Sequence, residues 1–316
     1  MKMFCHTPRE NWIVDRMGKE FSKYSSFDVS FDTIDNTTDV IWLLGSWCWN
    51  QIPLNCLKLK KVVCTIHHEV PEKFNKERID NFLIRDQFVD LYLTYTEETK
   101  KLINSLSKKE VLVLPHWINN NIWEKLNKKE CREILNLPEH KFIVGSFQRD
   151  TEGNDLISPK LEKGPDIFVE KVKQISNFRK DLLVLLGGWR RQYVIKNLQE
   201  LGIEYRYIEL PEQGTVNTMY NALDMYLISS RCEGGPQALF EAGYLKIPIL
   251  STPAGQFQHL SKDCIYQFKE KINQKKINLC LSKTEENFNT LKSFEIEKLV
   301  PVYEEVFKKI KNIKGV

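Results

Sequence analysis

The chain has 316 residues, of which 42% are hydrophobic and 28% are charged. Its 46 basic and 42 acidic side chains leave a formal net charge of +4. At roughly 100–200 residues per domain, this length is typical of two domains. The apolar content and the nearly balanced charge exclude a disordered chain, a collagen-like repeat and a protein that coats nucleic acid. A catalytic protein of two domains, with no nucleic-acid partner, is the class that remains.

Membrane-spanning and secretory signals are missing from the sequence. The longest purely apolar run, Leu182 to Leu186, is far shorter than the roughly 18 residues that cross a bilayer. The first residues do not resemble a signal peptide. The eight cysteines contain no Cys-x-x-Cys pair, so we expect reduced thiols rather than disulfides or a zinc site. A cytoplasmic location is therefore expected.

In the first half of the chain, short β-branched or aromatic runs alternate with longer segments that carry apolar residues at helical spacing. This alternation is typical of a doubly wound parallel sheet, because parallel strands need crossover helices that cover both faces. Helices are expected at 12–24, 71–88 and 97–106. The predicted strands are Met3–Cys5, Val29–Phe31, Val40–Leu44, Val62–Ile66, Leu91–Thr94 and Val111–Leu114.

The same α/β alternation then starts again, which predicts a second Rossmann-like sheet. Its strands are expected at Ile143–Phe147, Leu182–Leu186, Tyr205–Leu210, Met225–Ile228 and Ile247–Ser251. Pro138 and the charged residues 139–141 interrupt the pattern between the two halves. We therefore expect a first domain over 1–140, a second domain over 141–299, and a C-terminal helix at about 300–316 that packs back on the first domain.

The most informative segment is Ser229 to Gly243, which follows a predicted strand, turns on two glycines and enters a helix. Pro236 is expected to be the first helical residue, because the amide missing from proline has no partner there. The free amides of Gln237 and Ala238 then point out of the positive end of the helix, at the carboxyl edge of the sheet. This is a ready site for an anion.

Two carboxylates, Glu233 and Glu241, flank this expected anion site. A phosphate would repel both, so their natural partners are hydroxyl groups, and a carboxylate accepts two adjacent hydroxyls of a ribose or a sugar well. The simpler alternative is a Gly-Gly-Pro helix start with two solvent-facing glutamates. From these residues alone, both interpretations stay open.

The pattern Glu-Gly-x-Pro-x-x-Leu-x-Glu-Ala, followed by the strand Pro248–Ser251 and by residues 252–255, resembles the donor-site motif of retaining family 4 glycosyltransferases. The resemblance implies the GT-B fold, with two tandem Rossmann-like doubly wound domains that face each other across a cleft. It also implies that the second domain binds a nucleotide-diphosphate sugar. The implied donor-binding residues are Glu233, Gly234, Gly235, Pro236, Gln237, Ala238 and Glu241.

In the same family, an arginine after the first strand of the second domain and a lysine before the next helix hold the donor phosphates. Arg149 and Lys163 occupy these positions here. The sequence departs from the family in the 13 residues that separate them, 150–162. We expect this insertion to be a lid or to carry a function specific to this protein. A loop of this length is usually functional or mobile. Ordinary surface cations are the alternative interpretation.

Three further positions complete the implied site. His67, at the end of a first-domain strand, matches a family histidine that approaches the transferred sugar, whereas a strand-end histidine is otherwise more often structural. Leu210 lies in the segment that lines the nucleotide base. The family's Gly-rich first turn is replaced here by His6 to Trp12, and we expect this turn to shape an acceptor pocket together with Gly45 to Trp49.

The resemblance implies a retaining, front-face transfer of the sugar to a hydroxyl of a glycan or lipid-linked glycan. No metal cofactor is expected, since the sequence contains no Asp-x-Asp. If the acceptor is lipid-linked, peripheral contact of the protein with the inner membrane face is an open alternative. The alternatives are a nucleotide-sugar 2-epimerase and a non-catalytic sugar-nucleotide-binding subunit. The sequence does not define the sugar, the base, the acceptor or the oligomeric state.

Overall fold

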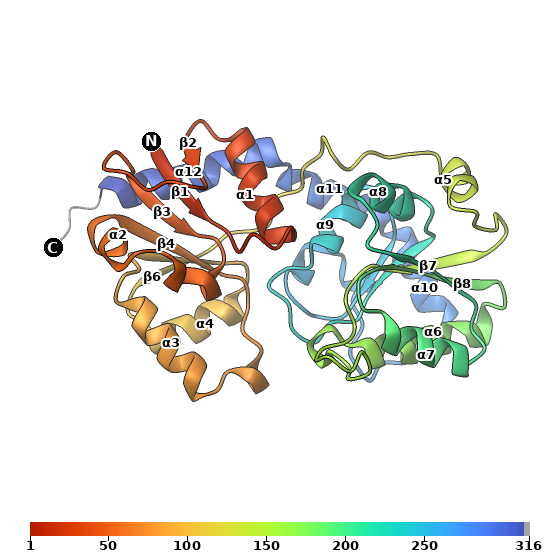
Figure 1. Cartoon of the computed structure of the whole chain (residues 1–316). Coiled ribbons are helices and arrows are strands. Elements are labelled where there is room, and N and C mark those ends of the chain that lie inside the picture. Colours follow the sequence, from red (N-terminus) through yellow and green to blue (C-terminus); the bar gives the residue numbers. More distant parts are fainter. Residues whose placement is uncertain (313–316) are drawn as a thin grey trace. The chain divides into compact units, whose positions relative to one another are not determined.

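The computed structural model describes residues 1–312, which form two compact units (Figure 1). The first unit combines Met1–Trp117 with the segment that begins at Phe294, and the second unit spans Ile118–Ser293. Each unit contains one sheet, of six strands in the first and five in the second, and every strand pairing is parallel. The expectation of two Rossmann-like α/β sheets in tandem is confirmed.

The sheet of the first unit has the strand order β2-β1-β3-β4-β5-β6. Its strands are β1 (Lys2–His6), β2 (Asp28–Ser30), β3 (Val40–Leu43), β4 (Lys61–Ile66), β5 (Leu91–Thr94) and β6 (Glu110–Val113). Its helices are α1 (Ile13–Tyr24), α2 (Leu54–Leu59), α3 (Lys76–Asp86), α4 (Glu97–Leu106) and α12 (Ile296–Asn312).

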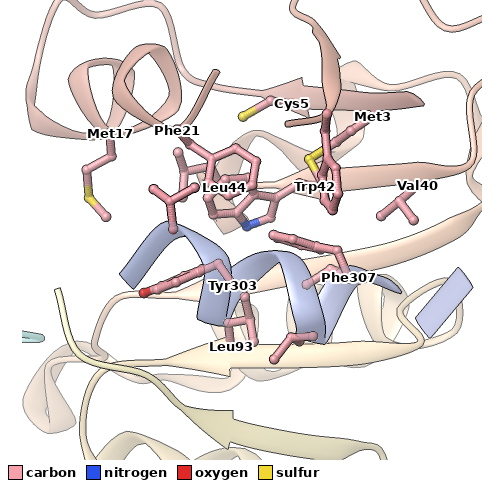
Figure 2. Packing of buried hydrophobic residues seen from close by; sticks show 14 of the residues in the cluster. Met3, Cys5, Met17, Phe21, Val40, Trp42, Leu44, Leu93, Tyr303 and Phe307 are labelled. Carbon is pink, nitrogen blue, oxygen red and sulfur yellow. The ribbon is translucent and has the colours of Figure 1, made fainter. Parts of the chain in front are cut away.

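Two hydrophobic layers cover the faces of this sheet, because successive strand residues point to opposite sides. In β3, Ile41 packs with the layer that includes residues of α3 and α4, and Trp42 packs with the layer formed by α1 and α12. Figure 2 shows the second layer, in which Phe21 and Phe307 contact Trp42 at ring-centroid distances of 5.0 and 5.1 Å. Both strand faces are thus dry, as a parallel sheet requires.

The long helix α12 belongs to this core although it lies at the far end of the sequence. Tyr303 and Phe307 point from α12 towards Trp42 (Figure 2), and Glu304 accepts hydrogen bonds from the hydroxyl groups of Ser25 and Ser26 and from the Ser26 amide. The helix that the sequence predicted at about 300–316 therefore begins earlier, at Ile296, and lies in the first unit. Its expected residues 313–316 lie outside the described residues.

The sheet of the second unit has the strand order β11-β10-β7-β8-β9. Its strands are β7 (Phe142–Ser146), β8 (Leu182–Gly188), β9 (Tyr205–Glu209), β10 (Met225–Ile228) and β11 (Ile249–Ser251). Its helices are α5 (Lys128–Ile134), α6 (Pro165–Phe178), α7 (Gln192–Glu200), α8 (Gln213–Asn221), α9 (Gln237–Tyr244), α10 (Gln274–Ser282) and α11 (Thr284–Leu291).

The division between the units falls at 117/118, whereas the sequence pattern placed it at 140/141. The segment between these points is fixed to the second unit by Arg132 on α5, whose guanidinium donates to the Ala222 carbonyl at 2.9 Å and to Asp224 at 2.7 Å. Asp224 also accepts from the amide of Ile143, the second residue of β7, at 2.7 Å. The charged interruption at 139–141 is therefore a loop inside the second unit.

The sequence analysis expected no membrane-spanning helix, and reduced thiols rather than disulfides. No helix within residues 1–312 is long and apolar enough to cross a membrane. All eight cysteines are free thiols, and six of them are buried.

Candidate functional site

The candidate donor site lies where β7 and β10 end. These strands are neighbours in the sheet, with Tyr226 paired to Gly145. Because parallel strands end at the same edge, the residues after β7 and after β10 lie together, and this edge is where open α/β sheets bind ligands. Gln148 follows β7 and Ser230 follows β10, and the Ser230 hydroxyl lies 3.3 Å from the Gln148 side-chain oxygen.

Lys163 and Glu233 form an ion pair at this edge, with 2.7 Å between Nζ and Oε1. The Glu233 side chain is 7% exposed, and its Oε1 also accepts from the Ser230 hydroxyl at 2.9 Å. The Gln148 side-chain amide donates to the Lys163 carbonyl at 2.8 Å. Two residues that lie 70 positions apart in the sequence are thereby brought into direct contact at this edge.

The backbone around Lys163 explains why a glycine follows it. Gly164 has φ of +59°, and a Cβ at this position would lie 1.9 Å from the Ser229 carbonyl oxygen. Only glycine lets the chain come so close to the end of β10. Beside it, Arg231 forms a bidentate ion pair with Asp166 at 2.8 and 2.6 Å, in the first turn of α6. The start of α6 is therefore fixed to the loop after β10.

The helix that follows Glu233 starts one residue later than predicted. Pro236 has φ of −65° but ψ of +117°, so it is the N-cap of α9 and the first helical residue is Gln237. The Pro236 carbonyl accepts from the Leu239 amide at 2.9 Å. Because proline at the cap has no amide of its own, the orphan amides at this helix end begin with Gln237 and Ala238. No acceptor for these two amides is found within residues 1–312.

The two glycines of the motif shape the loop that leads into α9. Gly234 is buried, and Gly235 has φ of +159°, which is extended backbone. Residues 235–238 are half-buried, so the start of α9 is partly open to solvent. A positive helix end with open amides is suited to an anionic group.

Glu241 lies in the interior of the second unit rather than on its surface. Its Oε2 accepts a hydrogen bond from the Tyr220 hydroxyl at 2.9 Å, and Tyr220 is fully buried on α8. Trp123, in the segment that enters the second unit, packs edge-on against Tyr220 with 5.7 Å between ring centroids. Asn221 donates to the Glu124 carbonyl at 2.9 Å and fixes the same segment to α8. The Tyr220 side chain therefore connects Glu241 to the segment that contains Trp123.

Arg149 extends along the same edge, one strand further. Its Nε donates to the Thr151 carbonyl at 2.7 Å, and its guanidinium lies 5.5 Å from the centre of the Trp189 ring. Arg190 stacks on the same ring at 5.3 Å. Partial burial and the nearby Arg190 lower the pKa of Arg149, although an arginine keeps its charge at neutral pH. Within residues 1–312 no direct contact joins Arg149 to the Lys163–Glu233 pair.

The inserted segment 150–162 is a short hairpin with a fixed base. Thr151 and Pro159 form an antiparallel bridge. At the base, Asp150 and Arg191 form an ion pair at 2.9 Å with both side chains 1% exposed. Burial raises the pKa of Asp150, and Arg191 opposes this shift. The tip carries the exposed side chains of Leu156 and Ile157.

Two predicted residues, Leu210 and His67, do not take part in these contacts. Leu210 follows β9, the edge strand, and its side chain is exposed, with a left-handed φ of +45°. His67 belongs to the first unit, where it follows β4. Its Nε2 lies 2.9 Å from the Leu44 carbonyl oxygen, and its ring packs against Trp47 and Tyr95.

The protonation of His67 follows from these contacts. A carbonyl oxygen only accepts, so Nε2 carries the hydrogen and Nδ1 keeps its lone pair. Burial lowers the pKa of His67 to about 4. At neutral pH the ring is therefore uncharged, and Nδ1 can accept a hydrogen bond from a hydroxyl group.

Sequence reasoning missed Gln148, Ser230 and Tyr220 as parts of the site. Gln148 and Ser230 directly follow β7 and β10, and this placement at the carboxyl edge was the available signal. Tyr220 gave no signal, because its contact with Glu241 depends on how α8 and α9 pack.

Comparison with known proteins identifies the second unit. Residues 157–296 match the family model described as glycosyl transferases group 1. Over this segment, which is less than half of the chain, the sequence is similar to the glycosyl transferases group 1 family. A curated relative, the lipopolysaccharide core biosynthesis mannosyltransferase LpsB of Rhizobium meliloti (strain 1021), is 24% identical over 156 residues. That match covers 47% of this chain and 42% of the relative, so the chain aligns with less than half of that protein.

Two solved structures share the fold over nearly the whole chain. Sucrose-phosphate synthase from Thermosynechococcus elongatus has a TM-score of 0.76 at 12% identity, covering 98% of this chain and 99% of that chain. HepE from Anabaena, in complex with UDP-glucose, has a TM-score of 0.76 at 13% identity, covering 98% of this chain and 100% of that chain. At such identities the likeness concerns the fold, and it confirms the expected GT-B architecture.

Proposed function

We propose that this protein is a retaining glycosyltransferase that moves a sugar from a nucleotide-diphosphate sugar to a hydroxyl of a glycan or lipid-linked glycan. The observation that carries the proposal is the Lys163–Glu233 pair beside the open start of α9, inside the segment that matches the family. The names of the similar proteins support the substrate classes. LpsB is a lipopolysaccharide core mannosyltransferase, and the HepE structures contain UDP, glucose or UDP-glucose.

The donor diphosphate would lie at the start of α9, where the Gln237 and Ala238 amides lack acceptors within residues 1–312. Lys163 can donate a hydrogen bond to the diphosphate while it stays paired with Glu233, because an ammonium group has three hydrogens and the ion pair uses one. Arg149 would add a second cation. Charged hydrogen bonds of this kind contribute about 1.5–3 kcal/mol each. These groups aim positive charge at the leaving phosphate, which is the task a metal ion performs elsewhere, so we propose transfer without a metal.

The two carboxylates would bind the hydroxyl groups on either side of the diphosphate. Glu233, held by Lys163 and Ser230, would accept a hydrogen bond from a hydroxyl of the transferred sugar. Glu241, oriented by its hydrogen bond from Tyr220, would accept from a hydroxyl of the ribose. Gly234, Gly235 and Pro236 would shape the loop, and Leu210 would lie near the base.

In the transfer step, the bond between the anomeric carbon and the phosphate oxygen breaks, and the acceptor oxygen forms a bond on the same face of the sugar. The acceptor proton passes to the departing phosphate oxygen, so no protein nucleophile is needed. Donors that are already oriented lower the barrier because they need no reorganisation during the reaction. His67, neutral with a free lone pair on Nδ1, would position the sugar through one of its hydroxyls.

The test is a product assay with nucleotide sugars and candidate glycan acceptors. NMR should show a new glycosidic bond with the donor's anomeric configuration, and Glu233→Ala and Arg149→Ala should each abolish transfer while the protein stays folded. An inverted product would overturn retention. An epimer of the donor formed without acceptor would instead indicate a 2-epimerase. Donor binding without turnover on any acceptor would indicate a binding subunit, and a metal requirement would contradict the metal-free step.

The acceptor class has a consequence for location. A lipid-linked glycan is presented at a membrane surface, so we propose peripheral contact with the cytoplasmic face of the membrane for that case. Co-sedimentation with vesicles that carry the lipid-linked acceptor would test this, and absence of binding to such vesicles would favour a soluble acceptor.

A further inference from the structure

The positive charge of the chain is concentrated in one segment of the second unit. Residues 262–283 carry six lysines and only two acidic side chains, which gives this segment a net charge of +4. The whole chain has the same net charge, so all other residues together carry 40 basic and 40 acidic side chains. The segment follows β11, an edge strand of the sheet, and includes α10. None of its residues is assigned to donor binding.

Both acidic side chains of this segment are already paired within it. Glu270 forms an ion pair with Lys276 at 3.4 Å, and Asp263 forms one with Lys283 at 3.7 Å. The other four lysines are Lys262, Lys269, Lys271 and Lys275. Their side chains are exposed and make no hydrogen bond or ion pair within residues 1–312. Four positive charges of the segment therefore have no partner of opposite sign in the described part of the chain.

The loop that carries Lys269 and Lys271 has a fixed backbone. Lys171 on α6 is fully buried, and its ammonium group donates to the carbonyls of Phe268 and Glu270, both at 2.8 Å. These two carbonyls therefore point into the unit, whereas the side chains at 268, 269 and 271 are exposed. A backbone that is fixed before binding lowers the entropy lost on contact with a partner.

Three large apolar side chains are exposed among these lysines. Phe268 precedes Lys269 and is 37% exposed, and Leu279 and Leu281 on α10 are 37% and 36% exposed. Leu279 follows Lys275 by four positions, so the two lie on the same side of α10. Lysine stems can lie along apolar material while the ammonium groups reach phosphates. This combination of cations with aromatic and aliphatic side chains suits the boundary between lipid headgroups and acyl chains.

The kind of cation also indicates the partner. A site shaped for a single phosphate or carboxylate favours arginine, whose planar fork donates to two oxygens at once. Residues 262–283 contain six lysines and no arginine. Lysine is a flexible point charge, which suits a surface that presents many anionic groups without a fixed geometry. A layer of anionic lipid headgroups has this property, and it also accepts apolar side chains below the phosphates.

We propose that residues 262–283 bind the surface of a membrane that contains anionic lipid. This binding rests on the segment itself, whereas its purpose, to hold the enzyme where a lipid-linked acceptor is presented, rests on the proposed function. The segment is connected to the candidate donor site within one unit. The Tyr266 amide donates to the Ser251 carbonyl at 2.9 Å, and the Thr252 hydroxyl donates to the Ser230 carbonyl at 2.6 Å. Membrane binding through this segment therefore orients the donor site relative to the lipid surface.

The test is co-sedimentation with two kinds of vesicle, neither of which contains a lipid-linked acceptor. One kind is pure phosphatidylcholine, and the other contains about one third phosphatidylglycerol, which is anionic. The test variant replaces three unpaired lysines of the segment: Lys269→Gln, Lys271→Gln and Lys275→Gln. The matched control removes the same charge at exposed, unpaired lysines on α4, α6 and α7: Lys101→Gln, Lys173→Gln and Lys196→Gln.

The unaltered protein and the control should bind the anionic vesicles equally and the neutral vesicles much more weakly. The test variant should bind the anionic vesicles about 100-fold more weakly, since each lysine near an anionic surface contributes about fivefold. Added salt should weaken binding because it screens exposed charges. Absence of binding by the unaltered protein, or equal binding by the folded test variant and the control, would overturn the proposal.

A second pair of variants distinguishes a lipid surface from another polyanion. Phe268→Ser removes an apolar side chain from the segment and should weaken binding to the anionic vesicles. Ile134→Ser, at an exposed isoleucine on α5 of the same unit, should not. If both variants bind as tightly as the unaltered protein, the segment recognises charge alone and the proposed lipid contact is wrong.

Binding of a nucleotide sugar, measured on the same proteins, separates this proposal from the proposed function. It should be equal in the unaltered protein, the test variant and the control, because the replaced lysines lie outside the donor site. Absence of nucleotide-sugar binding by the unaltered protein would contradict the transferase function alone. Absence of binding to anionic vesicles would overturn the membrane-binding segment alone.

Discussion

Lys163 Nζ lies 2.7 Å from Glu233 Oε1, and this pair joins the turn before α6 to the loop before α9. Both groups sit at the carboxyl ends of adjacent strands, and Ser230 and Gln148 complete the network. A lysine paired in this way is oriented before any donor arrives. Its remaining hydrogens can therefore meet a phosphate without a large loss of side-chain freedom.

Replacement of Glu233 by glutamine should separate catalysis from folding. Glu233→Gln keeps the shape and an acceptor for Ser230 but removes the charge. We expect the rate of sugar transfer to fall about 100-fold or more, while the free energy of unfolding falls by about 1–3 kcal/mol, because the Glu233 side chain is largely buried and loses a charged partner. Steady-state kinetics and urea unfolding measure the two effects. Glu285→Gln, at the exposed pair with Lys246, is the control and should leave both unchanged. Normal transfer by Glu233→Gln would remove Glu233 from the site.

Tyr220→Phe should weaken donor binding through Glu241. The variant removes the hydroxyl that orients this carboxylate, so affinity for a nucleoside diphosphate should fall by about three- to tenfold. The 2′-deoxy and 3′-deoxy nucleotides should lose less affinity on mutation than the parent nucleotide, because they lack a ribose hydroxyl that Glu241 would bind.

Tyr266→Phe is the matched control, since its buried hydroxyl donates to the Ile228 carbonyl at 2.9 Å in the same unit. It should lose similar stability and keep donor affinity. If calorimetry shows equal losses of affinity for both variants, Tyr220 has only a structural role.

Acidification should destabilise the first unit partly through His67. Its pKa is about 4 when folded and 6.5 as a free group, so the unfolded chain binds more protons between these values. Stability should therefore be complete above pH 6.5 and decrease as the pH falls towards 4. At 1.36 kcal/mol per pKa unit, the contribution of this one group is at most about 3 kcal/mol.

His67→Gln should flatten part of this pH dependence, as measured by urea unfolding between pH 4.5 and 7.5. The exposed His140→Gln should leave the dependence unchanged. An unaltered slope in His67→Gln would show that the folded-state pKa of His67 is not depressed.

The sequence predicted the strands better than it predicted the domain limit or the contacts between helices. Most of the parallel strands were predicted because they are short apolar runs, such as 182–186 in β8, bounded by polar residues. The motif pointed to Glu233 and Lys163 as members of one site but not to their direct pairing. The domain limit was misplaced because α5 is short and polar outside, and its attachment through Arg132 depends on tertiary contacts with Asp224. The partner of Glu241 was equally invisible, since Tyr220 lies on a different helix.

The base of the inserted hairpin should be structural and its tip dispensable for folding. Asp150→Ala leaves Arg191 as an unpaired buried charge, so we expect a loss of about 3–5 kcal/mol. A Gly-Ser replacement of the exposed residues 153–157 should change stability by less than about 0.5 kcal/mol. Denaturant unfolding of both variants checks this. Should the tip replacement prove as damaging as Asp150→Ala, the hairpin would be part of the folding core.

The central claim is that the edge formed by β7 and β10 binds a nucleotide-diphosphate sugar. Isothermal titration of a panel of nucleotide sugars into the unaltered protein and into Arg149→Ala tests it most directly. We predict that at least one nucleotide sugar binds the unaltered protein and that Arg149→Ala weakens this binding about tenfold, as expected for one charged hydrogen bond. Absence of binding across the panel, or equal affinity in the two proteins, would contradict the claim.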